Sequence, residues 1–177
     1  GETITSVSGI SDIFLGSAVT YSNESKESIL GVSHDTIMEH GAVSEECARE
    51  MALGSLKAYG SDIAVAVTGI AGPDGATPEK PVGLVYIAAT DGKDFVTSAN
   101  RFFGDRKEVR LSSVYAMFRD SQKELERIQQ QLLEEDTPQS DEELLALAEA
   151  GVRTFCTGGK MITRSFSYVG EHAQQYI

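Results

Sequence analysis

The sequence predicts an α/β fold, a three-layer α/β/α sandwich with a mostly parallel sheet, followed by an acidic helical segment. Three observations support this prediction. Strand-prone and helix-prone stretches alternate through residues 1–118, as in domains whose helices cover a sheet. Two apolar runs, Ile63–Val67 and Gly83–Ala89, have the length of buried strands. Between residues 120 and 150 glycine is absent and acidic residues accumulate.

The first elements are a short strand and a capped helix. Ser17–Tyr21 is a β-prone run. Ser22 or Asn23 can cap a helix over Glu24–Leu30, because both side chains accept hydrogen bonds from first-turn amides. Glutamates in that first turn favour the same helix through its dipole.

A longer helix is predicted over Glu45–Tyr59, with Ser44 as its cap and Gly60 at its end. Cys47, Met51 and Leu56 recur on one face of it, which is typical of a helix that covers a core.

Three strands and a further helix follow. Ile63–Val67 is expected to be a central strand that is buried on both faces, and Gly83–Ala89 a second buried strand. Asp94–Phe103 is more polar, which favours an edge position. Asp105 can then cap a helix that continues through Met117.

Residues 120–150 form an acidic helical segment in the prediction. They hold ten acidic and two basic residues, so that eight of the chain's twelve net negative charges lie there. Leu125, Ile128 and Leu132 recur at helical spacing, and Pro138 should interrupt the helix. Ser140 or Asp141 can cap a second helix. The pair either binds a partner or packs on its own domain as a charged hairpin.

Composition excludes several classes of function. At 177 residues and 41% hydrophobic content the chain can bury a substantial core. A net charge of −12 argues against nucleic acid or an anionic membrane as a partner, because both attract basic surfaces. The cysteines, Cys47 and Cys156, and the histidines, His34, His40 and His172, have no metal-ligand spacing. We therefore expect a cytoplasmic protein without a metal or another cofactor.

The first candidate for chemistry is the loop between the two apolar runs, Val67–Gly83. It contains glycines that let backbone amides approach a ligand, prolines that stiffen the loop, and Lys80. A loop at the end of a buried strand is where α/β sheets place ligands. It matches neither of the glycine-rich phosphate-binding patterns, so a purely structural role stays open.

Two further segments offer charged groups. Tyr21 and Lys26 lie where the first strand enters a helix, and a lysine near a tyrosine hydroxyl can accept a proton. Arg106 lies in the first turn of a helix, where amides and a guanidinium together suit an anion. Alone, each of these residues is equally compatible with a solvated surface side chain.

Four runs of the chain closely resemble the C-terminal domain of the competence/damage-inducible protein CinA: GSAVTYSNESKESILGV, HGAVSEECAREMA, AVAVTGIAGPDGATPEKPVGLVYIA and FFGDRKEVR. The resemblance covers residues 1–118 almost without a gap. That family includes the stand-alone nicotinamide-nucleotide amidases. It implies an oligomeric α/β/α domain that hydrolyses the carboxamide of nicotinamide mononucleotide to the acid, releasing ammonia without a metal.

The resemblance also implies roles for individual residues. The family uses a serine nucleophile that lysine and tyrosine activate, and Lys26 and Tyr21 match the lysine and tyrosine of its YSNExK motif. Thr68 matches the threonine of VTGIAGP, and Arg106 matches the arginine of GDR. Gly69, Gly72, Lys80 and Arg106 are the expected substrate-binding residues, with nicotinamide mononucleotide or a related nucleotide as the ligand.

The chain departs from the family in the order of its motifs. The family opens with a helix, a strand and the sequence AESCTGG, whose serine is the nucleophile. Here a similar opening lies at the other end of the chain, over residues 142–159, with Phe155 at the serine position. We therefore divide the chain into a CinA-like domain (1–118), an acidic linker (119–141) and a displaced or second-copy opening (142–177).

Several explanations of this order stay open. The chain is either a permuted or tandem arrangement, a tandem protein with missing pieces, or an engineered permutant with a helical linker. Cys156 is an alternative nucleophile. The leading prediction for function is a homo-oligomeric nicotinamide-nucleotide amidase domain. The alternative is a non-catalytic nucleotide-binding or assembly module of the same family.

Overall fold

The computed structural model describes residues 1–135 of the chain. This part divides into two compact units. One unit consists of Gly1 and Leu15–Glu124, and it holds every residue of the candidate site that the structure describes. The other contains Glu2–Phe14, with helix α1 (Glu2–Thr5) and the 3-10 turn η1 (Ile10–Asp12), and, among the described residues, 125–135. Within the described residues no helix is long and apolar enough to cross a membrane.

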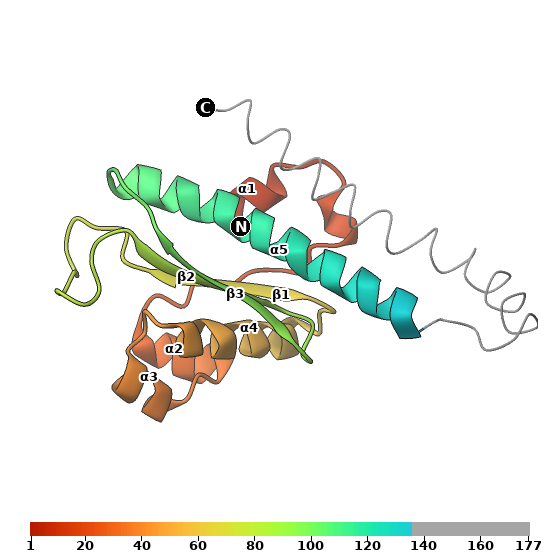
Figure 1. Ribbon diagram of the computed structural model, residues 1–177, viewed down its shortest axis with the longest axis horizontal. Coiled ribbons are helices and arrows are strands. Elements are labelled where there is room, and N and C mark those ends of the chain that lie inside the picture. Colours follow the sequence, from red (N-terminus) through yellow and green to blue (C-terminus); the bar gives the residue numbers. More distant parts are fainter. Residues whose placement is uncertain (136–177) are drawn as a thin grey trace, which may run out of the picture. The chain divides into compact units, whose positions relative to one another are not determined.

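The larger unit has a three-stranded sheet between two helical layers (Figure 1). The strands are β1 (Ala64–Gly69), β2 (Leu84–Thr90) and β3 (Phe95–Arg101). Helices α2 (Asn23–Leu30), α3 (His34–His40) and α4 (Glu45–Tyr59) lie on one face. The first half of α5 (Arg106–Glu135) lies on the other.

The sheet is antiparallel throughout, in the order β1-β2-β3, so the predicted mostly parallel sheet is wrong for the described residues. The reason lies in the connections. A parallel pair needs a crossover that carries the chain back along the sheet, usually a helix. Here a loop without a helix joins β1 to β2, and a short turn at Asp91–Asp94 joins β2 to β3.

The predicted positions of the strands are confirmed in part. β1 and β2 form almost where the apolar runs predict them, and β3 is the edge strand that its polarity predicts. However, β2 rather than β1 is the middle strand of the three. Ser17–Tyr21 forms no strand among the described residues.

Alternation along β1 and β2 sorts their side chains into two cores. Ala66 and Ala88 pack under α2, α3 and α4 with Cys47, Met51 and other buried residues. The opposite face buries Val85 and Ile87 against Val109 and Ala116 of α5. Because Thr68 follows Ala66 by two positions, its side chain lies on the α4 face of the sheet.

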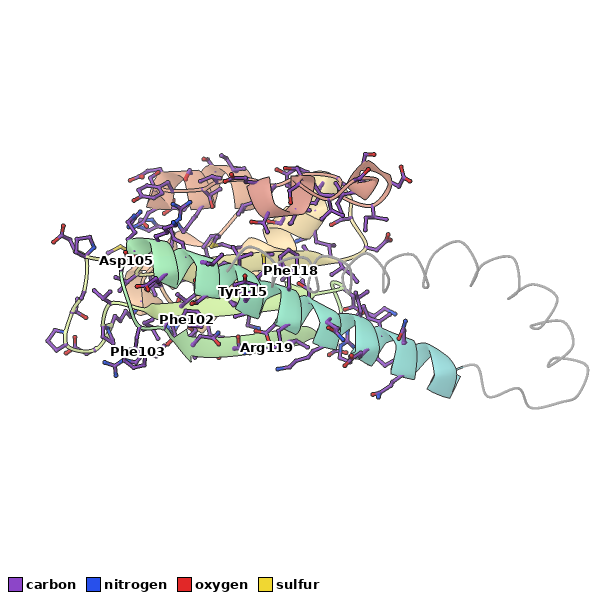
Figure 2. All side chains as sticks on the ribbon, turned by 90° about the horizontal axis from the view of Figure 1, so that it is seen from above. Phe102, Phe103, Asp105, Tyr115, Phe118 and Arg119 are labelled. Carbon is purple, nitrogen blue, oxygen red and sulfur yellow. The ribbon has the colours of Figure 1, made fainter. Side chains whose placement is uncertain are left out.

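The helices begin where local capping predicts. Ser22 accepts a hydrogen bond from the Ser25 amide, and Ser44 accepts one from the Cys47 amide. Asp105, labelled at the start of α5 in Figure 2, accepts from the amides of Lys107 and Glu108 at 2.8 and 2.9 Å. The helix that Asp105 caps then continues to Glu135 without interruption, through the predicted boundary at residue 118. The second acidic helix predicted after Pro138 lies outside the described residues.

Asp120 joins α5 to β3. Its carboxylate is fully buried and accepts hydrogen bonds from the Ser98 hydroxyl on β3 and from the Arg119 guanidinium at 3.0 Å. The Lys123 ammonium lies 3.4 Å from the same carboxylate. Burial raises the pKa of Asp120, but the hydrogen bonds from Arg119 and Ser98 outweigh it and hold the pKa below its usual value.

We expect Asp120→Asn to lower the free energy of unfolding at pH 7 by about 1.5–3 kcal/mol, the usual worth of charged hydrogen bonds. A carboxyl group whose pKa is lower in the folded state stabilises the protein above its unfolded pKa. That contribution is lost as the pH falls through the folded pKa. The difference between parent and variant should therefore shrink below about pH 4. Urea unfolding across pH checks this, with the exposed Asp62→Asn as the control; a pH-independent difference contradicts it.

Candidate functional site

Side chains from two other elements hold the segment that leads into α4. The Thr68 hydroxyl, near the end of β1, donates to the Ala42 carbonyl at 2.6 Å. The Lys80 ammonium, from the loop between β1 and β2, donates to the carbonyl oxygens of His40 and of Val43, the latter at 2.7 Å. Three backbone carbonyls between residues 40 and 43 are thus satisfied from outside the segment, which fixes where α4 begins.

The N-terminus of α4 completes this arrangement. The Ser44 hydroxyl donates to the Gly41 carbonyl at 2.8 Å and accepts from the Cys47 amide at 3.2 Å. The first-turn amides of this fifteen-residue helix carry partial positive charge. A site beside them therefore favours a polar or anionic group.

Lys26 is the second cation of the candidate site, and unlike the half-buried Lys80 it is buried. It is 6% exposed, and its ammonium donates to the carbonyl oxygens of Thr20 at 2.7 Å and of Tyr21 at 3.4 Å. Among the described residues neither Lys26 nor Lys80 forms an ion pair with a carboxylate. Carbonyl oxygens carry only partial charge, so the groups that hold the two ammonium groups do not neutralise them.

Cys47, in the first turn of α4, is influenced by the charges of both lysines. Burial raises the pKa of the Cys47 thiol, while the positive charges of Lys26 and Lys80 both act to lower it. Both lysines therefore lie within electrostatic range of the first turn of α4. Cys47 is fully buried and the net pKa is raised, so the thiol behaves as a small core side chain rather than as a nucleophile.

The structure joins Thr68 and Lys80 to one segment and places Lys26 within electrostatic range of Cys47, but it gives Tyr21 a different environment. The Tyr21 side chain is 81% exposed, and its contact with Lys26 is made by the backbone carbonyl. The expected contact between the tyrosine hydroxyl and the lysine is therefore replaced by a backbone contact.

The glycine-rich loop is anchored at its other end by Arg106. The guanidinium donates to the Gly72 carbonyl at 2.8 Å, and Gly72 has a left-handed φ of +79°. At Gly69 a Cβ atom would lie 2.8 Å from the Leu84 carbonyl oxygen, so only glycine fits beside β2. These two glycines shape the loop, and the remaining N–H donors of Arg106 can hold an anion.

No group of three or more potential metal ligands occurs in the described part of the chain. His34 instead pairs with the Glu27 carboxylate at 2.9 Å, and that hydrogen bond and charge raise the pKa of the imidazole. Phe155, the residue at the family's serine position, and Cys156 lie outside the described residues.

The sequence did not reveal the residues that hold the site together. The carbonyls of residues 40–43 carry no side-chain signal, and their role depends on a fold that brings Thr68 and Lys80 to them. Thr20, which adjoins Lys26 through its carbonyl, was also missed, although it directly precedes Tyr21 in the motif.

Comparison with known proteins relates this fold and site to one family. A sequence model of the CinA C-terminal domain matches residues 1–125. A CinA-like protein of Thermotoga sp. (strain RQ2) is 49% identical over 110 residues, which are 62% of this chain and 27% of that protein. A CinA-like protein of Citrifermentans bemidjiense is 56% identical over 107 residues, 60% of this chain and 26% of that protein. The chain thus spans about a quarter of the length of these curated relatives.

Solved structures agree with the sequence comparison. The competence/damage inducible protein CihA from Agrobacterium tumefaciens is 40% identical, with a TM-score of 0.62 over 64% of this chain and 70% of that one. The competence damage-inducible protein A (ComA) from Klebsiella pneumoniae is 35% identical, with a TM-score of 0.64 over 68% of this chain and 75% of that one.

The role of Lys80 as an anchor can be tested without a ligand. We expect Lys80→Met to lower the free energy of unfolding by about 1–3 kcal/mol, since the carbonyls of His40 and Val43 lose a charged donor. Amide hydrogen exchange at residues 40–47 should quicken. Lys93→Met, at an exposed turn, is the matched control. Equal stability and exchange in the two variants would show that Lys80 does not hold this segment.

Proposed function

The chain belongs to the CinA C-terminal domain family, and on that basis we propose that it carries the binding and proton-transfer parts of a nicotinamide-nucleotide amidase site. The ligand is nicotinamide mononucleotide, and the products of the complete site are nicotinic acid mononucleotide and ammonia. The observation that carries this proposal is a pair of lysines that form no ion pair with a carboxylate among the described residues. Lys26 is buried, and Lys80 is half-buried and, with Thr68, holds the segment that leads into α4.

Each part of the site has a function in carboxamide hydrolysis. A hydroxyl attacks the carboxamide carbon and passes its proton to Lys26 as the general base. Negative charge that develops on the carbonyl oxygen is stabilised by Lys80 and the amides of α4. Lys26 returns this proton to the nitrogen as the C–N bond breaks, so that ammonia leaves, and water then hydrolyses the acyl intermediate. Thr68 positions this end of α4 through its hydrogen bond to Ala42.

Arg106 is the proposed phosphate ligand. It is the first residue of α5, where amide groups and the guanidinium can together hold an anion. Its hydrogen bond to the Gly72 carbonyl ties that position to the glycine-rich loop. In this proposal the loop contributes Gly69 and Gly72 as backbone close to the nucleotide, and Lys80 as a charge.

The nucleophile decides between two functions. The resemblance places a serine where this chain has Phe155, and phenylalanine has no hydroxyl. The chain as written should therefore bind the nucleotide and hydrolyse it slowly or not at all. The second candidate function, a non-catalytic nucleotide-binding or assembly module, is favoured by this one residue. In either case we propose a homo-oligomer in the cytoplasm whose partner is a nucleotide rather than nucleic acid or a membrane.

Nicotinamide mononucleotide should bind to the full chain. Arg106→Ala should weaken that binding about ten- to a hundredfold, because a charge-assisted contact to phosphate is worth about 1.5–3 kcal/mol. Isothermal calorimetry measures this, and the neighbouring first-turn variant Lys107→Ala controls for loss of charge alone. An absence of heat at millimolar ligand, or equal losses in both variants, would count against the phosphate site.

The parent chain should release no ammonia from nicotinamide mononucleotide above background. If residues 142–159 supply the family opening, Phe155→Ser restores release, and adding Lys26→Ala abolishes it again, because nucleophile and base act as a unit. Robust release by the parent would contradict the assignment and make Cys156→Ala the next variant. If no variant releases ammonia although nicotinamide mononucleotide still binds, the non-catalytic module is favoured.

A further inference from the structure

Among the described residues one buried side-chain atom has no hydrogen-bond partner, the hydroxyl oxygen of Thr20. Thr20 is only 7% exposed. Buried polar groups in folded proteins are almost always paired, because a hydroxyl loses its bonds to water on burial. This exception requires an explanation.

The position of the hydroxyl supplies one. The carbonyl of Thr20 accepts the 2.7 Å hydrogen bond from Lys26. The unpaired hydroxyl therefore belongs to a residue that is in direct contact with the proposed general base. Val19 and Tyr21, on either side, are 87% and 81% exposed. The side chain between them is buried, so Thr20 faces the protein interior and not the solvent.

The other hydroxyls around the site are already occupied. The Thr68 hydroxyl donates to the Ala42 carbonyl at 2.6 Å, and the Ser44 hydroxyl donates to Gly41 and accepts from the Cys47 amide. A ligand that bonded to them would have to displace an existing hydrogen bond. A ligand that bonds to Thr20 displaces none, and it relieves the cost of the unpaired group.

We infer that the Thr20 hydroxyl is a binding residue for the carboxamide group of the ligand. A primary carboxamide offers an oxygen that accepts and N–H groups that donate. In the proposed mechanism the Lys80 ammonium, which can only donate, serves the carboxamide oxygen, whereas the hydroxyl oxygen of Thr20 can accept an amide N–H. Together the two residues fix the direction of the C–N bond that breaks. This inference rests on the proposed function and adds a residue to it.

The experiment compares Thr20→Val, Thr20→Ser and Thr68→Val in the full chain. Valine keeps the shape of threonine and removes the hydroxyl, while serine keeps the hydroxyl. By calorimetry Thr20→Val should bind nicotinamide mononucleotide about five- to twentyfold more weakly than the parent. Thr20→Ser should stay within about twofold of the parent. The urea midpoint of Thr20→Val should equal or exceed that of the parent, because no hydrogen bond is lost, whereas Thr68→Val should lower it.

Each outcome either supports or overturns the assignment of Thr20 as a binding residue. Weaker binding by Thr20→Val with unchanged stability and rescue by serine supports the assignment. Equal binding by the parent and Thr20→Val overturns it and leaves the proposed function in place. A drop in the urea midpoint like that of Thr68→Val also overturns it, because the hydroxyl then serves the free protein, for example through a buried water. A parent that binds no nicotinamide mononucleotide overturns the proposed function and this assignment with it.

Discussion

Two ammonium groups that are held by backbone carbonyl oxygens, one buried and one half-buried, organise the candidate site. Lys26 donates to the carbonyls of Thr20 and Tyr21, and Lys80 donates to those of His40 and Val43. Both carbonyl-bearing segments are irregular and have no ladder to satisfy them, so the lysines are structural as well as cationic. The same residues that fix these segments therefore provide positive charge for the proposed ligand.

Alternation along β1 places Thr68 on the face of the sheet that α4 covers. Val65 and Val67 of β1 face α5, while Ala66 and Thr68 face α4. The loop after β1 carries Lys80 back to the segment that Thr68 already holds. The antiparallel return of β2 makes this possible, because the loop begins and ends at the same end of the sheet as Thr68. Asp120 secures the opposite layer by joining α5 to β3.

Local chemistry was the part of this structure that could be predicted. Ser22, Ser44 and Asp105 cap helices within a few residues of themselves, so the predicted starts of α2, α4 and α5 are confirmed. Strand direction depends on what joins and pairs distant segments, and the predicted parallel sheet is wrong in the described residues for that reason. Thr68 and Lys80 could be selected from the sequence. Their carbonyl partners and the unpaired hydroxyl of Thr20 can be identified only in the folded chain.

If Lys26 and Lys80 form one ligand site, nuclear magnetic resonance of the lysine side chains should detect one ligand at both. With lysine labelled at Cε and Nζ, added nicotinamide mononucleotide should shift the signals of Lys26 and Lys80 together, with one dissociation constant. The signals of Lys57 and Lys93, on exposed surface, should stay in place. Shifts confined to the exposed lysines, or a saturating ligand that leaves the signals of Lys26 and Lys80 unchanged, would show that these two lysines do not form a ligand site.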